Sequence, residues 1–89
     1  MIRRTVLFSG RVQGVGFRYA ACRVAAGYQV TGFVRNLADG CVEAVIEGDA
    51  QAIEAFLRTL REEMAGYIRD TQSWEAPAAG EFADFDVRF

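Results

Sequence analysis

Two residue types with wide catalytic use are missing from this chain of 89 residues, which contains no histidine and no lysine. Without histidine, the chain lacks the commonest general base, a phosphohistidine intermediate and any Ser-His or Cys-His nucleophile pair. Without lysine, it cannot complete the Gly-Lys-Ser/Thr end of a Walker phosphate loop. Any chemistry in this protein must therefore depend on other side chains.

Cysteine is also scarce, since Cys22 and Cys41 are the only two. They lie far apart in the sequence and have no histidine to complete a ligand set, so we expect neither a metal ion nor another cofactor. We expect both thiols to behave as small apolar side chains, one on a helix and one on a strand.

The chain also lacks a large excess of charge of either sign, and it has no long apolar run. Ten arginines against twelve acidic residues give a formal net charge of −2 at pH 7, which disfavours general binding to nucleic acid or to a membrane surface. No apolar run approaches the length of a membrane span, and the N-terminus lacks the apolar core of a signal peptide. We therefore expect a cytoplasmic protein with no nucleic-acid or membrane partner, in which any anion site is local.

Apolar residues, by contrast, make up 52% of the chain. That proportion is enough for one hydrophobic core without metal or disulfide support. No internal repeat, linker or low-complexity segment divides the sequence. We expect residues 1–89 to form a single domain, and we expect a monomer.

The most informative stretch runs from residue 8 to residue 18, FSGRVQGVGFR, where an apolar strand leads through a glycine-rich loop into a helix. Gly10, Gly14 and Gly16 allow the backbone to adopt positive φ and to point successive N–H groups into one concavity. Arg18 falls in the first turn of the expected helix, where unpaired N–H groups and the helix dipole favour an anion. A guanidinium there can donate two parallel hydrogen bonds to one phosphate.

The pattern alone leaves a second interpretation open, in which this loop is only a tight strand-to-helix turn and Arg18 is a solvated side chain. The dinucleotide-binding pattern G-x-G-x-x-G does not apply, because its third glycine would fall on Tyr19.

Apolar periodicity predicts the elements around the loop. Alternation predicts strands at residues 4–10, 30–36, 41–47 and 85–89. Helical spacing predicts one helix from Phe17 to Tyr28 and another from an Asp49 N-cap to Met64. Residues 66–74 have no clear alternation and are predicted as a further strand, followed by a loop at residues 76–80.

This order, β-α-β-β-α-β plus a short C-terminal strand, describes an α+β, ferredoxin-like sandwich in which an antiparallel sheet carries two helices on one face. The Asp39-Gly40 turn is typical of an antiparallel hairpin between residues 30–36 and 41–47. Period-2 alternation then puts Asn36 on the helix-facing side of the sheet.

Two blocks of the chain resemble the acylphosphatase family, in the order and with the separation usual there. The first is GRVQGVGFR at residues 10–18, and the second is GFVRN at residues 32–36. The second block continues with Gly40, Cys41, Val42 and Gly48. The resemblance runs from about Val6 to the end, and it implies the same fold and a hydrolase that converts acyl phosphates to carboxylate and inorganic phosphate.

The resemblance also implies roles for individual residues. By position, Arg18 corresponds to the phosphate-binding catalytic arginine of the family, and Asn36 to the asparagine that orients the attacking water. The phosphate cradle corresponds to the backbone of Val12, Gln13, Gly14, Val15, Gly16, Phe17 and Arg18. The implied substrate is a small acyl phosphate, with inorganic phosphate as product and competitive inhibitor and with no metal or cofactor.

An acyl phosphate suits a chain without histidine, because its carboxylate leaves without being protonated, and positioning and charge stabilisation do most of the work. Two alternatives stay open. From the residues alone, Asn36 can be a turn residue ahead of the Asp39-Gly40 turn. The chain as a whole can be a catalytically idle acylphosphatase-like module that only binds anions, although the presence of both Arg18 and Asn36 favours the enzyme.

Overall fold

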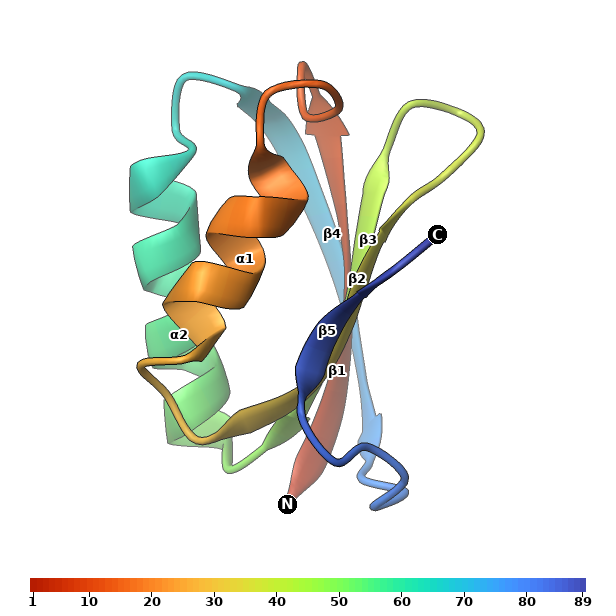
Figure 1. Cartoon of the computed structure of the whole chain (residues 1–89). Coiled ribbons are helices and arrows are strands. Elements are labelled where there is room, and N and C mark those ends of the chain that lie inside the picture. The colour runs from red at the N-terminus through yellow and green to blue at the C-terminus, as the bar shows by residue number, and fades with distance from the viewer.

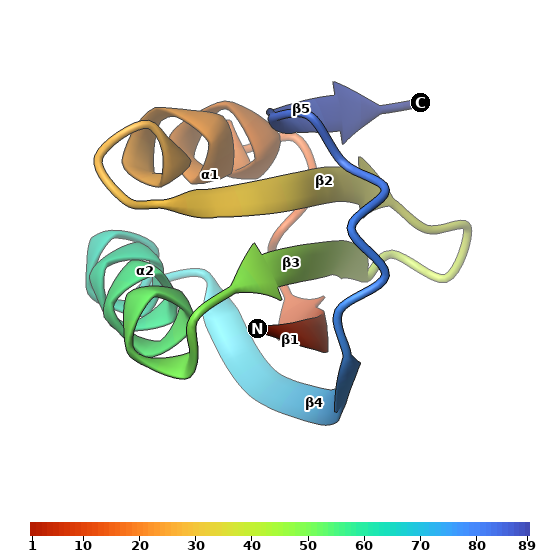
Figure 2. The same ribbon diagram turned by 90° about the horizontal axis from the view of Figure 1, so that it is seen from below.

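The computed structural model describes all 89 residues, and its five strands form one sheet in the order β4-β1-β3-β2-β5. The elements are β1 (Ile2–Gly10), α1 (Phe17–Ala25), β2 (Val30–Asn36), β3 (Val42–Gly48), α2 (Ala50–Glu63), β4 (Ile68–Pro77) and β5 (Phe85–Arg88). Both helices cover the same face of the sheet, α1 beside β2 and β5 and α2 beside β3 (Figures 1 and 2). This is the ferredoxin-like α+β fold that the sequence predicts.

The hydrophobic core lies between the two helices and the sheet face that they cover. Val6 and Phe8 of β1 are fully buried in it, as their alternation predicts. The rings of Phe8 and Phe17 lie 4.9 Å apart between centroids, which fixes the first turn of α1 against β1. Both ends of the glycine-rich loop are thereby attached to the core. Neither helix is long and apolar enough to cross a membrane.

The strand at the β4 edge differs most from its prediction. It runs from Ile68 to Pro77, so the expected loop at residues 76–80 is wrong for its first two positions. The reason is that β1 begins already at Ile2, which pairs with Pro77 and extends the ladder. Most residues of β4 are exposed because it is an edge strand. It therefore lacks the alternation by which a half-buried strand is recognised, and a proline is tolerated at its end.

The helix ends also differ in detail. α1 ends at Ala25, so the prediction that it reaches Tyr28 is wrong. The N–H groups of Gly27 and Tyr28 bond to carbonyls three residues back, closing a tighter turn. Tyr28 remains half-buried, with its hydroxyl 2.7 Å from Oγ1 of Thr59 on α2. Asp49 occupies the N-cap position of α2 as predicted, but its side chain makes no capping hydrogen bond.

The C-terminal strand, for which the sequence predicted neither a partner nor a direction, adds the one parallel pairing to an otherwise antiparallel sheet. β5 pairs parallel with β2, with Val87 opposite Val34, whereas all other pairs are antiparallel. Phe85 packs on the core, its ring 5.4 Å from that of Phe56 on α2. Because the two strands run in the same direction, β5 delivers Phe89 to the level of the β2 end that carries Asn36.

Candidate active site

The loop between β1 and α1 turns through two glycines with left-handed backbone, Gly14 at φ 77° and Gly16 at φ 80°. A Cβ atom at either position would meet no atom within 4 Å. Glycine is therefore favoured here by conformation rather than by lack of space. Gly16 is also the N-cap of α1, and its carbonyl oxygen accepts the N–H of Ala20 at 2.9 Å.

The backbone N–H groups of residues 12–18 donate to no acceptor within the protein. Those of Phe17 and Arg18 belong to the first turn of α1, where no earlier helical carbonyl can accept them. The positive end of the α1 dipole lies at the same place and makes the electrostatic potential there more favourable for an anion. The loop and the helix start can therefore bind an anion through the main chain alone.

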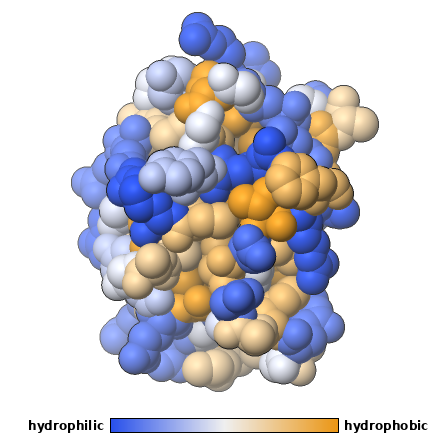
Figure 3. Space-filling view, in the orientation of Figure 1, coloured by the Kyte–Doolittle hydropathy of each residue, from blue (hydrophilic) through white to orange (hydrophobic).

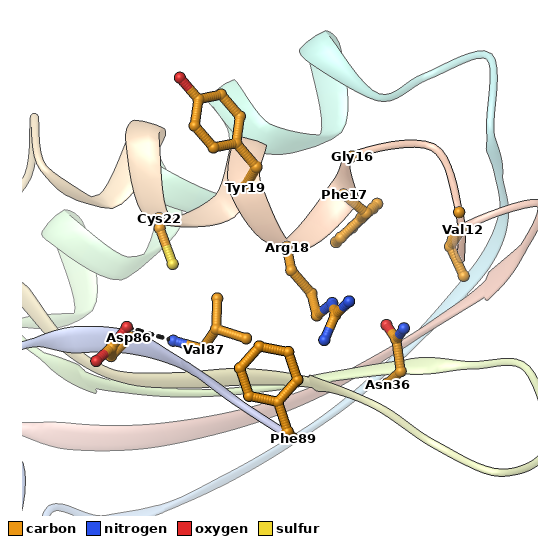
Figure 4. A pocket seen from close by; sticks show the side chains of 11 residues that line it. Val12, Gly16, Phe17, Arg18, Tyr19, Cys22, Asn36, Asp86, Val87 and Phe89 are labelled. Atoms are coloured by element: carbon orange, nitrogen blue, oxygen red, sulfur yellow. Dashed lines mark hydrogen bonds between the residues drawn. The ribbon is translucent and has the colours of Figure 1, made fainter.

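Arg18 and Asn36 line one pocket of about 400 Å³ although they come from different elements. Arg18 is half-buried in the first turn of α1, and Asn36 is exposed at the end of β2. The guanidinium of Arg18 extends into the space between Asn36 and Phe89 (Figure 4). It forms no ion pair with a carboxylate, and its central carbon lies 5.1 Å from the ring centre of Phe89. The positive charge of Arg18 is thus available to a ligand.

Most of the predicted cradle residues lie around this pocket. Its lining includes Val12, Gly14, Gly16, Phe17 and Arg18. Two cradle residues, Gln13 and Val15, are not part of the lining. Val15 packs against the core, and Gln13 points its side chain away from the pocket toward the β2–β3 hairpin.

The side chain of Gln13 has a structural role that sequence reasoning missed. Its Nε2 donates to the carbonyl oxygen of Leu37 at 2.8 Å and to that of Cys41 at 2.9 Å. These bonds tie the loop to both sides of the hairpin turn, directly after Asn36. No local pattern announces such a contact, because the partners are main-chain atoms 24 and 28 residues away.

The family model for acylphosphatase matches residues 4–87. The protein belongs to the acylphosphatase family. A relative named acylphosphatase, from Syntrophotalea carbinolica, is 44% identical over 93 residues, which cover 99% of this chain and 97% of the relative. The solved acylphosphatase from Bacillus subtilis has a TM-score of 0.89 and 28% identity over 100% of both chains. In the structure of T. kodakarensis HypF the match has a TM-score of 0.85 and 32% identity, and it covers 100% of this chain but 12% of that one.

In this acylphosphatase-family chain the pocket extends well beyond the loop, onto α1 and β5. Cys22, Asp86, Val87 and Phe89 line this second part, and the sequence did not single out any of them for the site. Burial, and then the negative charge of Asp86, raises the pKa of the Cys22 thiol, so the thiol stays protonated and acts as apolar lining. The Asp86 carboxylate accepts the N–H of Val87 at 2.7 Å.

The structure holds no group of three or more histidine, cysteine, aspartate or glutamate side chains placed to bind a metal ion. The pocket itself has two distinct ends. One end carries main-chain donors and the Arg18 guanidinium, and the other carries apolar side chains with one carboxylate. Such an arrangement can bind an anionic group and place an attached organic group beside it.

Proposed function

We propose that the protein is an acylphosphatase, which hydrolyses the carboxyl-phosphate bond of an acyl phosphate to a carboxylate and inorganic phosphate. One observation carries the proposal. Arg18 and Asn36 line a single pocket together with part of the glycine-rich loop, whose N–H groups have no acceptor within the protein.

The phosphoryl group binds in the cradle formed by the backbone of residues 12–18. Its oxygens accept hydrogen bonds from the loop N–H groups, and two of them accept the parallel donors of the Arg18 guanidinium. Because the donors are already in position, little reorganisation is needed as charge spreads over the phosphoryl oxygens in the transition state. Binding and charge stabilisation thus come from the same groups.

Asn36 holds the attacking water beside the cradle. Its amide is exposed at the end of β2 and points into the pocket from the sheet, next to Phe89, which follows the neighbouring strand β5 (Figure 4). A water held there in line with the scissile bond attacks phosphorus, and the P–O bond to the acyl group breaks with its electron pair going to the carboxylate. The proton lost by the water ends on the inorganic phosphate. No acid is needed, since a carboxylate is already a good leaving group.

Inorganic phosphate is expected to bind the same cradle and to inhibit competitively, because it presents the same oxygens to the same donors. The monomeric state and the cytoplasmic location stay predictions.

The second candidate is an idle anion-binding module, favoured by the match in which this fold forms 12% of the much longer HypF chain. Colourimetric assay of benzoyl phosphate hydrolysis, with and without a chelator, separates the two. The proposal expects turnover that the chelator leaves unchanged. Phosphate binding without turnover would favour the idle module, and complete dependence on an added divalent cation would contradict the mechanism.

A further inference from the structure

On the basis of the proposed function, we infer that the segment between β4 and β5 positions one side of the active-site pocket from the opposite face of the sheet. Residues 78–84 form this segment, the strap. Glu47 and Phe82 hold the strap in place, and neither of them lines the active-site pocket. Both are therefore positioning residues for the proposed reaction, and they act through β5.

β5 depends on contacts outside its own ladder, because it is the shortest strand of the sheet. Its four residues, Phe85–Arg88, pair with β2 alone and lie at the sheet edge. The other edge strand, β4, has ten residues and pairs with β1 along nearly its whole length. β5 nevertheless contributes Asp86 and Val87 to the pocket, and it is followed by Phe89, another lining residue. Whatever fixes β5 also fixes this side of the pocket.

The strap crosses the face of the sheet that no helix covers, from the β4 edge to the β5 edge (Figure 2). The Glu47 carboxylate on β3 accepts the N–H groups of Ala79 at 2.9 Å and Gly80 at 3.0 Å. Arg3 of β1 pairs with the same carboxylate at 2.8 Å and with Glu81 of the strap at 2.5 Å. The first half of the strap is thus attached to two inner strands.

The Phe82 ring attaches the second half of the strap to β2. It packs edge-on against Phe33, with 5.8 Å between ring centres, and the Arg3 guanidinium lies 5.2 Å from its centre. Phe33 is buried although it lies outside the core under the helices. The Arg88 guanidinium of β5 stacks on the same Phe33 ring, 4.0 Å from its centre. Strap and β5 therefore share one aromatic contact on β2.

The end of the strap leads directly into the β5 ladder. The carbonyl oxygen of Asp84 accepts the N–H of Gly32 on β2 at 2.8 Å, and Phe85 then pairs with Gly32. A second cavity of about 270 Å³ lies between the strap and β5, and Asp86 and Val87 line it as well as the active-site pocket. The single strand β5 thus separates the strap from the active site.

A shift of β5 would change one end of the pocket and leave the phosphate end in place. The cradle and Asn36 belong to the β1–α1 loop and to β2, and Gln13 ties that loop to the hairpin that follows Asn36. β5 lies beside α1 at the apolar area in the middle of Figure 3. Loosening of the strap should widen the pocket there and weaken binding of the organic part of a substrate, whereas inorganic phosphate still meets the same donors.

Steady-state kinetics with benzoyl phosphate tests the inference on the intact protein. Phe82→Ala is expected to raise KM by about fivefold with kcat nearly unchanged, and the inhibition constant for inorganic phosphate should stay within about threefold of the wild type. Phe82→Tyr keeps the ring and should restore KM to within about twofold. Trp74→Ala is the matched control, an exposed aromatic residue on β4 that should change none of these values.

A purely structural role of Phe82 predicts a different result. Partial unfolding would lower the active fraction, so the apparent kcat would fall while KM stayed the same. That result, or a KM that Phe82→Ala leaves unchanged, would overturn the inference and leave the proposed function standing.

A double variant tests whether Glu47 and Phe82 act through the same strap. Glu47→Gln should also raise KM, and Glu47→Gln combined with Phe82→Ala should exceed the larger single effect by less than about twofold, because the strap can be released only once. Thermal melting selects a temperature at which all variants are folded. Effects on KM that multiply fully would mean that the two residues act separately, which would overturn the assignment.

Hydrogen exchange reports on β5 without turnover and so separates this inference from the proposed function. The ratio of exchange rates of β5 amides to β3 amides should rise about tenfold in Phe82→Ala and in Glu47→Gln. Ile53→Val, a core variant on α2 that lowers the stability of the whole fold, should not raise this ratio. A raised ratio in a protein that hydrolyses no acyl phosphate would contradict the proposed function and still support the hold of the strap on β5. An unchanged ratio would overturn the strap.

Discussion

The amide nitrogen of Gln13 lies 2.8 Å from the carbonyl oxygen of Leu37, the residue that follows Asn36 in the chain. This hydrogen bond connects the phosphate-binding loop to the strand end that carries the proposed water-orienting side chain. A second bond, to Cys41, ties the same amide to the other side of the hairpin turn. The side chain of Gln13 thus links the cradle to the hairpin beside Asn36 without lining the pocket itself.

Replacement of Gln13 is therefore expected to affect both stability and catalysis. Gln13→Ala removes two hydrogen bonds worth about 1 kcal/mol each, so urea unfolding should show a loss of about 1–2 kcal/mol. The loosened loop should also lower kcat/KM by roughly tenfold. Gln72→Ala, on the exposed edge strand β4, is the control and should change neither value. An unchanged kcat/KM in Gln13→Ala would mean that the loop holds its position without the hairpin.

Arg18 should not be replaceable by lysine. Arg18→Ala is expected to lower kcat/KM by about 10³-fold, and Arg18→Lys should come within about tenfold of that loss, because an ammonium cannot donate two parallel hydrogen bonds to one phosphoryl group. Steady-state kinetics with benzoyl phosphate measures both. Arg23→Lys, on the same helix but exposed and paired with Glu63, serves as control. If Arg18→Lys kept most of the wild-type rate, Arg18 would act only as a source of positive potential.

Replacement of Asn36 should slow the chemical step without weakening substrate binding. Asn36→Ala is expected to lower kcat by about 10²-fold while KM and the inhibition constant for inorganic phosphate stay nearly unchanged, because the side chain contacts the water and not the ground-state phosphate. A turn role predicts another result, namely about 1 kcal/mol lower stability with normal kinetics. Thermal melts recorded beside the kinetics distinguish the two. A normal kcat with a lowered melting temperature would show that Asn36 has a structural role in the turn and none in catalysis.

Glu47 makes the fold sensitive to acid from a position outside the site. Its carboxylate, on β3, is buried, pairs with Arg3 at 2.8 Å, and accepts the N–H groups of Ala79 at 2.9 Å and Gly80 at 3.0 Å. Burial by itself would raise the pKa of Glu47, but these partners together outweigh it and the pKa is lowered from its ordinary value of 4.5. The carboxylate thereby holds the segment that leads from β4 to β5.

The sign of the pH dependence follows from that direction. A carboxyl with a lowered folded-state pKa stabilises the fold fully above the unfolded value of about 4.5, and the stabilisation is lost as the pH falls through the folded value. Urea unfolding at pH 7 and at about pH 3 measures the effect. The free energy of unfolding should fall less between these two pH values in Glu47→Gln than in the wild type, and at pH 7 the variant should be about 1–3 kcal/mol less stable. Glu43→Gln, on the same strand but paired with exposed Arg35, should differ little from the wild type. Equal acid sensitivity in Glu47→Gln and the wild type would contradict the assignment.

Short-range patterns in the sequence were sufficient to predict the element order and the positions of Arg18 and Asn36 on it, whereas the prediction that both belong to a site came from the resemblance to the acylphosphatase family. Gly14 and Gly16 mark a left-handed loop because few other residues adopt positive φ there, and Arg18 follows them into the first turn of a helix. Alternation puts Asn36 on the helix-facing side because successive side chains of a strand point to opposite faces. In the structure Arg18 and Asn36 line the same pocket, while their chemical roles stay predictions.

Other features depend on which distant segments meet, and only the tertiary structure decided them. The parallel pairing of β5 with β2 brings Val87 and Phe89 to the pocket, and no periodicity in a four-residue strand specifies its partner or direction. The partners of Gln13 are main-chain carbonyls, which every residue possesses, so the sequence cannot mark them. The charge of Glu47 predicts exposure, and it is buried only because Arg3 and two N–H groups from a distant segment satisfy it there.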